Sequence, residues 1–247
     1  LRTDRERAAH RSGPAQSEAR TSQTRLTLVP RTLVARLWLP DVPGTLGLIA
    51  AAIGRAGGDV SGIEILERAP GIAVDELLIE IPDDRSVDDL VNEVAAVAGV
   101  DIEDLHEVDA HRVDQSILAL EVAARIAQSP AANRIEVVCS SIRALLEADW
   151  CSVIDSDSIR ARSGTVPDEA WLSAFVGGIG HLSESASLEY TPGDVAWAPL
   201  EHQASYVVCG RKQRAFRRRE RQHLVLIARI ADSTLLIDPV TRPLDGP

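Results

Sequence analysis

The sequence predicts an α+β fold built from two successive domains. Between residues 33 and 108 the hydrophobic pattern passes through six short elements that have either the two-residue period of strands or the longer period of helices. After residue 114 a second region carries helices and strands of its own. Of the 247 residues 45% are hydrophobic but only 3% are aromatic, so the cores must be built from aliphatic side chains. We therefore expect a disordered leader at 1–31, domains at 32–110 and 114–235, and a tail at 236–247.

The first domain is predicted from its turn residues as well as from its periods. Pro40 closes the first strand, and the Gly57-Gly58 pair stands where a helix C-cap is expected. Ser86 is placed to cap the second helix, which Gly99 ends. The expected elements are a strand at 33–39, a helix from 46 to 56, strands at 60–66 and 72–81, a helix at 87–97 and a strand at 100–108. This order is that of a ferredoxin-like βαββαβ unit, with both helices on one face of an antiparallel sheet.

The junction between the first strand and the first helix carries a recognisable turn. Asp41, Pro43, Gly44 and Leu46 form a D-x-P-G-x-L pattern, and a Gly-Gly-Asp-Val segment at 57–60 leads into the next strand. With the later strand VDELLIEIP, these features resemble the ACT domain family, whose members are regulatory modules that bind small molecules. The resemblance spans residues 33–108. It implies a ferredoxin-like fold and a sensing role.

The chemistry of this turn suits a ligand that has two charged ends. Gly44 has no side chain to block an approaching molecule, and Pro43 holds its own backbone fixed. The N–H groups of Gly44, Thr45 and Leu46 then lie at a helix N-terminus, which favours a carboxylate. Asp41 could accept hydrogen bonds from an α-amino group. In the alternative reading, Asp41 and Thr45 only cap the helix.

The resemblance also implies an arrangement of two copies. ACT domains commonly pair side by side, and the ligand lies between the turn of one copy and the second strand of the other. The ligand-binding residues implied in this way are Asp41, Val42, Pro43, Gly44, Thr45, Leu46, Asp59, Val60 and Ser61. Val42, Ile63 and Ile65 could line a pocket for an aliphatic side chain, or they could be ordinary strand or dimer packing. We therefore expect a homodimer that binds an amino acid.

The second domain is predicted to be α+β as well. We expect helices at 114–128, from the 130s to 148, at 168–179 and at 217–231, and strands at 150–154, 159–162, 195–200 and 206–209. The strand that ends in Ala198-Pro199-Leu200, the strand that runs into Gly210-Arg211, and the closing helix resemble the end of a GAF-type sensory domain. That resemblance covers 117–233 and identifies no pocket residues. Trp197 and Tyr206 are expected in the core.

The densest run of charge in the chain is basic. It consists of Arg211, Lys212, Arg214, Arg217, Arg218, Arg219 and Arg221, and Glu220 interrupts it. Because the chain as a whole carries a formal charge of −11 and aromatics are not interleaved with the basic residues as in base-stacking platforms, we do not expect a nucleic acid as partner. We favour a solvated turn and helix start. The alternative is a contact with acidic residues of the first domain, namely Asp83, Asp84, Asp88 and Asp89.

Signatures of catalysis and cofactor binding are missing from the sequence. It contains no GxxxxGK, HExxH or G-x-S-x-G motif, and we expect no catalytic residues, no cofactor and no metal site. Cys139, Cys151 and Cys209 are far apart in sequence and are expected as buried free thiols. No apolar run reaches the length of a membrane span and no signal peptide is recognisable, so we expect a cytoplasmic protein without a membrane partner.

The function that these observations favour is that of a non-catalytic sensor. An amino acid would bind at an ACT dimer interface, and the GAF-like domain would relay the signal or add a second input. One alternative is an enzyme with an unrecognised C-terminal site, for example a pocket that joins His181 or His202 to Glu184. Another is a non-catalytic regulatory subunit of a partner protein.

Overall fold

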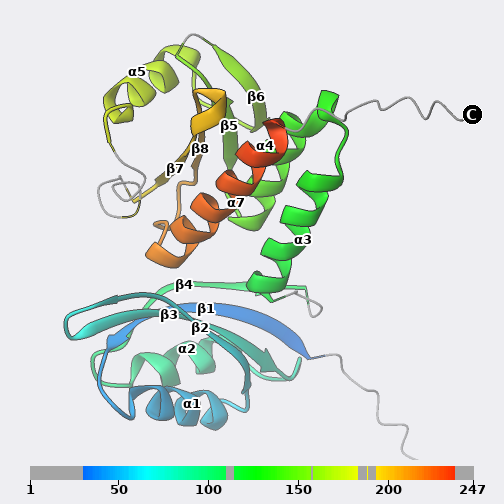
Figure 1. Cartoon of the computed structure of the whole chain (residues 1–247). Coiled ribbons are helices and arrows are strands. Elements are labelled where there is room, and N and C mark those ends of the chain that lie inside the picture. The colour runs from blue at the N-terminus through cyan, green and yellow to red at the C-terminus, as the bar shows by residue number, and fades with distance from the viewer. Residues whose placement is uncertain (1–29, 110–113, 157, 183–187, 189–192, 237–247) are drawn as a thin grey trace, which may run out of the picture.

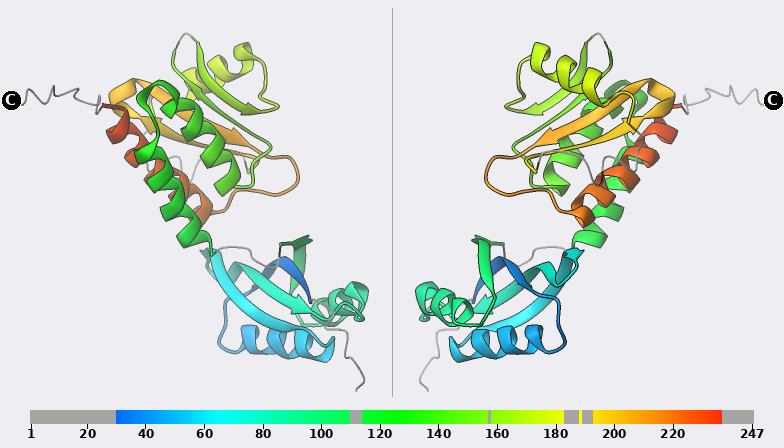
Figure 2. Two further views of the ribbon diagram at one scale, coloured as in Figure 1. Left: turned by 90° about the vertical axis from the view of Figure 1, so that its right-hand side faces the viewer. Right: turned by 90° about the vertical axis from the view of Figure 1, so that its left-hand side faces the viewer.

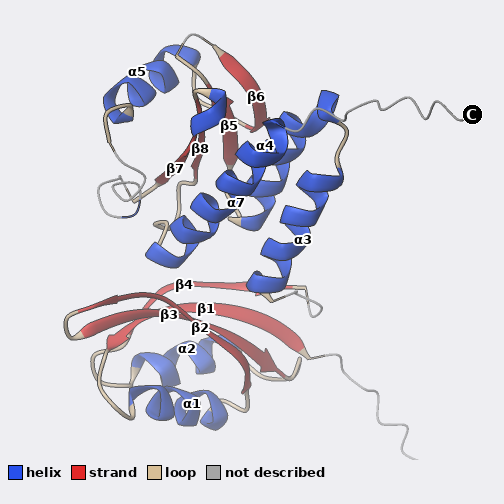
Figure 3. Ribbon diagram, viewed as in Figure 1, coloured by secondary structure: helices blue, strands red, loops and turns tan. Residues whose placement is uncertain are grey.

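The computed structural model describes residues 30–109, 114–156, 158–182, 188 and 193–236 of the chain. They form two antiparallel sheets, each with its own hydrophobic core, and the fold class is α+β (Figures 1 and 3). We call residues 30–109 the N-terminal half and residues 114–236 the C-terminal half. Residues 1–29 of the expected leader and 237–247 of the expected tail lie outside the described residues. No helix among the described residues is long and apolar enough to cross a membrane.

The N-terminal half has the ferredoxin-like arrangement. Its strand order is β2-β3-β1-β4, and every neighbouring pair is antiparallel. The elements are β1 (Arg31–Pro40), α1 (Thr45–Arg55), β2 (Asp59–Ala69), β3 (Ile72–Ile81), α2 (Val87–Ala95) and β4 (Asp101–Val108). The Ser86 hydroxyl caps α2 as expected, because it accepts the N–H groups of Asp88 and Asp89 at 3.1 and 3.3 Å. Arg31, which we had assigned to the leader, is the first residue of β1.

The two faces of this sheet have different surroundings. Alternate residues of β1 such as Leu33 and Leu37 pack on Ile49 and Ile53 of α1 and on Leu90 of α2. Both helices therefore cover one face, and the other face is turned toward the C-terminal half (Figure 1).

The C-terminal half is a four-stranded sheet between helices. The strand order is β6-β5-β8-β7, again antiparallel throughout. The elements are α3 (Gln115–Gln128), η1 (Ala131–Asn133), α4 (Arg134–Leu145), β5 (Trp150–Ile154), β6 (Ile159–Gly164), α5 (Glu169–Ile179), β7 (Val195–Leu200), η2 (Glu201–Gln203), β8 (Ser205–Gly210) and α7 (Arg218–Leu236). Three helices, α3, α4 and α7, share one core with the sheet, and α5 packs against its opposite face (Figure 1).

Two predicted helix ends in this half were wrong. The helix expected to reach residue 148 ends at Leu145, because Glu147 adopts a left-handed backbone with φ of 47° that no helix can continue. The closing helix expected to end at residue 231 continues to Leu236, so it includes the first residue that we had assigned to the tail. Its extra turn contains the buried Asp232, which holds the backbone N–H of His202 at 3.0 Å.

The halves meet through helix ends and one loop. The start of α7 and the start of α3 reach the open face of the N-terminal sheet, as both side views in Figure 2 show. The loop between β8 and α7 reaches the same face, and Arg36 of β1 donates a hydrogen bond to the Ala215 carbonyl at 3.2 Å. The basic stretch singled out in the sequence therefore lies between the two halves.

Candidate functional site

The 41–46 turn is held by its own backbone. The Asp41 N–H donates to the Gly71 carbonyl at 3.2 Å, which ties the turn to the β2–β3 hairpin, and the Val42 N–H donates to the Pro40 carbonyl at 2.9 Å. Gly44 stands at the N-cap of α1 with a φ of 96°, a left-handed conformation that L side chains adopt only with strain. The glycine is thus required by the turn geometry itself.

The capping interpretation of this turn is wrong, because no side chain caps α1. The Thr45 hydroxyl and the Thr45 N–H both donate to the Val42 carbonyl, at 3.1 and 3.3 Å, so that this N–H is not free as we had expected. Within the described part of the chain no acceptor meets the N–H groups of Gly44 and Leu46. These two donors are available to an anionic group at the helix N-terminus.

The other predicted ligand residues lie at the far end of α1. Asp59 and Ser61 begin the edge strand β2, and the 11 residues of α1 separate them from the turn by about 16 Å at 1.5 Å per residue. The Asp59 carboxylate accepts the N–H of Val60 at 2.9 Å. A single chain therefore does not bring the two groups together, and the predicted site needs a second copy.

Three apolar side chains, one each from the turn, α1 and β2, are exposed to solvent. Val42 is 57% exposed, Leu48 of α1 is 62% exposed and Ile63 is 50% exposed. Ile63 pairs with Leu77, which lies in the core, so it is directed to the same face but has no strand beyond it. Ile63 and Val42 are therefore not ordinary core residues of this chain, and a pocket or a dimer contact remains as their predicted role.

The C-terminal half contains a cavity of about 670 Å³ between α5 and the β7–β8 connection. Its lining is mixed: the hydroxyl groups of Ser156, Ser173, Ser205 and Tyr206 and the carboxylate of Glu201 lie among the apolar or small residues Val176, Gly177, Gly180, Leu182, Pro199, Leu200 and Ala204. Trp197 is buried as predicted, whereas Tyr206 is only half-buried and lines the cavity. A volume of this size is typical of sites for small organic molecules.

The histidines considered for catalysis, His181 and His202, are neighbours in sequence of lining residues but do not themselves line this cavity. His202 Nδ1 lies within hydrogen-bonding distance of the carboxylate of the buried Asp232, at 2.7 Å, and this contact fixes η2 on the last turns of α7. His181 is exposed, and Glu184 lies outside the described residues. Among the residues that the structure describes, no cluster of three or more His, Cys, Asp or Glu side chains could hold a metal ion.

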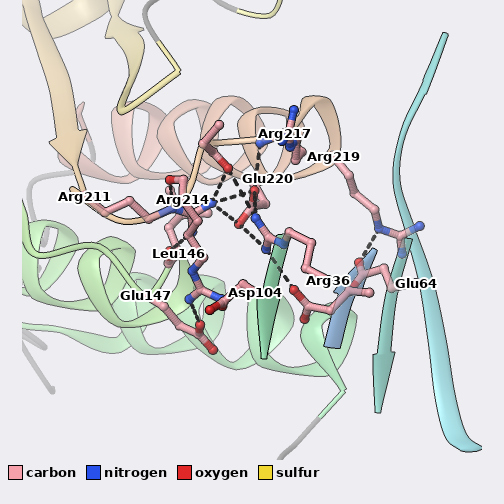
Figure 4. A network of polar contacts seen from close by, with 12 residues as sticks. Arg36, Glu64, Asp104, Leu146, Glu147, Arg211, Arg214, Arg217, Arg219 and Glu220 are labelled. Carbon is pink, nitrogen blue, oxygen red and sulfur yellow. Dashed lines mark hydrogen bonds and ion pairs between the residues drawn. The ribbon is translucent and has the colours of Figure 1, made fainter. Parts of the chain in front are cut away.

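A buried network of charges joins the two halves (Figure 4). Its centre is Arg36, which is 2% exposed and donates to Glu76 at 2.8 Å and to Glu220 at 3.3 Å. Arg211 donates to the same Glu220 carboxylate at 2.8 Å. The backbone N–H of Arg217 adds a further donor at 2.7 Å. Glu220 therefore bridges two guanidinium groups that come from different halves.

Three more arginines of the basic stretch surround this centre. Arg214 pairs with Asp104 and Glu147, Arg217 pairs with Glu103 and Glu67, and Arg219 pairs with Glu64. The Arg217 guanidinium also lies over the ring of Trp38, at 4.5 Å from its centre. The expectation of a solvated turn at 211–221 was therefore wrong. The alternative, a contact with the N-terminal half, is correct, but the sheet carboxylates replace Asp83, Asp84, Asp88 and Asp89 as its partners.

The charge of Glu220 is maintained by this network. Burial alone would raise the pKa of its carboxyl group, but the guanidinium groups of Arg211 and Arg36 and the Arg217 N–H outweigh burial and hold the pKa below its ordinary value. Glu220 is consequently ionised at neutral pH and forms charge-assisted hydrogen bonds with both halves.

All three cysteines are buried free thiols, as predicted. They lie together in the core, where Cys139 and Cys151 have their sulfur atoms 3.8 Å apart and Cys209 pairs with Cys151 across the sheet. Burial raises the pKa of Cys209 to about 12. This thiol therefore stays protonated and is a poor nucleophile.

Comparison with known proteins leaves the family of the chain open. No family model matches it. No curated protein matches it by sequence. The chain is similar to a solved GAF domain from an Acinetobacter phosphoenolpyruvate-protein phosphotransferase, with 15% identity and a TM-score of 0.37 over 49% of this chain and 92% of that one.

Two further structures are similar over parts of the chain. A bacteriophytochrome from R. palustris is 13% identical with a TM-score of 0.34, over 70% of this chain and 47% of that one. A formyltetrahydrofolate deformylase from Pseudomonas putida is 17% identical with a TM-score of 0.28, over 38% of this chain and 37% of that one. The chain thus spans less than half of either protein. The fold described above rests on its own strand order.

Proposed function

We propose that the protein is a non-catalytic regulator that binds an amino acid at the 41–46 turn, between two copies of its N-terminal half. The observation that carries this proposal is the turn itself, in which the N–H groups of Gly44 and Leu46 have no acceptor among the described residues. The Asp41 carboxylate stands at the start of the same turn and is partly exposed, with only a 3.9 Å approach from Arg68. Donors for a carboxylate and an acceptor for an ammonium group thus stand on one short loop.

The edge strand β2 supports the involvement of a second copy. An exposed edge strand with apolar neighbours is a surface that proteins normally cover. If two copies pair along β2, the exposed Val42, Leu48 and Ile63 become buried, and they would favour an aliphatic side chain in the ligand. The residues Asp59, Val60 and Ser61 of the second copy would then close the site.

The network around Glu220 supports the regulatory part of the proposal. The turn leaves the same strand, β1, that carries Arg36 in its centre. A change in the sheet on binding would be transmitted to α7 through the buried hydrogen bonds between Arg36 and Glu220. The C-terminal half, which carries the serine-lined cavity, would relay this change or add its own input.

Thermal unfolding in the presence of each of the twenty amino acids tests the proposal. An amino acid present at a hundred times its dissociation constant stabilises the folded state by about 2.7 kcal/mol, which raises the midpoint by several degrees. We expect such a rise with an aliphatic amino acid at millimolar concentration. No rise with any of the twenty would contradict the proposal.

Two variants locate the effect. Asp41→Asn should abolish the response to the amino acid and leave the midpoint of the free protein unchanged, because the Asp41 side chain is partly exposed and makes no close contact. Asp84→Asn, an exposed carboxylate elsewhere in this half, is the matched control and should respond like the wild type. Ile63→Glu should shift the protein from dimer to monomer in sedimentation velocity.

A further inference from the structure

A groove of about 550 Å³ lies between β2 of the N-terminal half and the first turns of α7. It is separate from the 41–46 turn and from the cavity beside α5. Its lining consists of Ile65, Leu66, Glu67, Arg68, Leu188, Arg218, Arg219, Gln222, His223, Val225 and Leu226. Both halves of the chain contribute to it, and its volume is that of a small-molecule site.

The polar lining of the groove is unusually basic for this chain. The protein carries a formal charge of −11, yet three arginines and one histidine line this groove against a single carboxylate. Glu67 is already paired with Arg217, and Arg219 is paired with Glu64. Arg218 is exposed and has no partner among the described residues, and Arg68 has only the 3.9 Å approach to Asp41. Two guanidinium groups are thus available to an anion.

The remaining lining is apolar or neutral. Leu66 and Val225 are buried, whereas Leu226 is 53% exposed. Burial, and then the neighbouring Arg219, lowers the pKa of His223, which is therefore neutral at pH 7 and can accept or donate a hydrogen bond. Gln222 offers a further neutral donor and acceptor.

We propose that this groove binds a small amphiphilic anion, a carboxylate or phosphate carried on an aliphatic body. The anionic head pairs with Arg218 and Arg68, and the body covers Leu226 and Ile65. Because Arg68 and Ile65 belong to β2 and the others to α7, the bound molecule bridges the two halves beside the charge network. This site uses different residues from the proposed amino-acid site, and the 3.9 Å ion pair between Arg68 and Asp41 is the one contact that joins the two sets of residues.

Calorimetric titration with four compounds of one chain length tests the chemistry. Hexanoate and hexyl phosphate carry the anionic head, whereas 1-hexanol is neutral and hexylammonium is cationic. We expect the two anions to bind and the other two to show no binding at the same concentration. The stronger of the two anions identifies whether a carboxylate or a phosphate is preferred.

Three single variants test the location. Arg218→Ser should weaken binding of the anions about tenfold, the effect of one lost charge-assisted hydrogen bond. Leu226→Asp places a carboxylate in the groove and should abolish binding. Both side chains are exposed, so the thermal midpoint should not change. Arg162→Ser removes an exposed arginine from β6 outside the groove and should bind like the wild type.

Three outcomes would overturn the inference. They are the absence of binding by either anion at millimolar concentration, equal binding of 1-hexanol, and anion binding that Arg218→Ser and Leu226→Asp leave unchanged. A protein that binds hexanoate here but responds to no amino acid would refute the proposed function alone.

Discussion

At the scale of the single residue, the Glu220 side chain is the one on which the stability of the folded protein depends most. It lies on the first turn of α7 and accepts hydrogen bonds from Arg36, Arg211 and the Arg217 backbone. Breaking a buried ion pair costs more than the pair contributes, because the remaining charge is left in a poorly solvated place. The residue is therefore a sensitive point for stability.

The substitution Glu220→Gln should destabilise the protein by about 3 kcal/mol, since it leaves two guanidinium groups facing a neutral amide. Urea unfolding at pH 7 measures the change. Glu121→Gln, on the exposed side of α3, removes the same charge without a buried partner and should stay within about 0.5 kcal/mol of the wild type. Equal effects of both substitutions would show that the network does not stabilise the fold.

The same carboxylate predicts a pH dependence. The pKa of Glu220 is lower in the folded state than the ordinary value of 4.5, so the folded state binds fewer protons than the unfolded state in the range between the two values. The stabilisation from this group is complete above about pH 5 and is lost as the pH falls through its folded pKa. The difference in unfolding free energy between wild type and Glu220→Gln should therefore be constant from pH 7 to 5 and shrink below pH 4.5. A difference that grows on acidification would contradict this assignment.

At the scale of the element, the start of α1 depends on the backbone of one glycine. Gly44 adopts φ of 96°, and a Cβ atom there would meet nothing within 4 Å, so the cost of a side chain is backbone strain alone. Gly47, three residues later inside the helix, has the same open space but ordinary helical geometry. The two positions form a matched pair.

Gly44→Ala should lower the free energy of unfolding by about 1–2 kcal/mol, which is the cost of holding the backbone of an L-amino acid in the left-handed region. Gly47→Ala should raise it by about 0.5–1 kcal/mol, because alanine restricts the unfolded chain and favours the helix. Chemical unfolding of both variants measures the pair. If both substitutions stabilise the protein, the turn does not hold the backbone conformation described here.

The elements that the sequence predicted best are those whose limits are local. The strands Trp150–Ile154 and Val195–Leu200 have the predicted bounds, because each is an apolar run between polar turns. The helix cap at Ser86 was also predictable, since a cap involves residues two and three positions away. The end of α7 depends instead on a distant contact, that of the buried Asp232 with His202, and the helix was therefore predicted to end five residues too early.

The contacts between the halves could not be predicted from local pattern. Arg36 and Glu220 are 184 positions apart, and nothing in the sequence near either residue specifies the other. One signal was present, a single arginine in the middle of the apolar strand LVARLWL, which indicates that the second face of the sheet meets charged groups. The cavity beside α5 had no such signal, because its shape depends on how that helix packs over the sheet.

At the scale of the whole molecule, the two halves have separate cores but share buried charges. The network removes Arg36 from solvent almost completely and places Arg217 on Trp38. Groups that are buried only when both halves are folded couple their unfolding, because each half exposes unpaired charges of the other when it unfolds.

We therefore expect one calorimetric transition for the wild-type protein, with equal calorimetric and van't Hoff enthalpies. The double variant Arg36→Leu/Arg217→Leu removes the two side chains that cross-link the halves most extensively, and should split this transition into two. Arg55→Leu, which removes the exposed pair with Glu93, changes the surface charge without touching the boundary and should keep a single transition with almost the same midpoint. Two transitions already in the wild type would mean that the halves unfold independently, and a ligand signal could then not pass between them through the charge network.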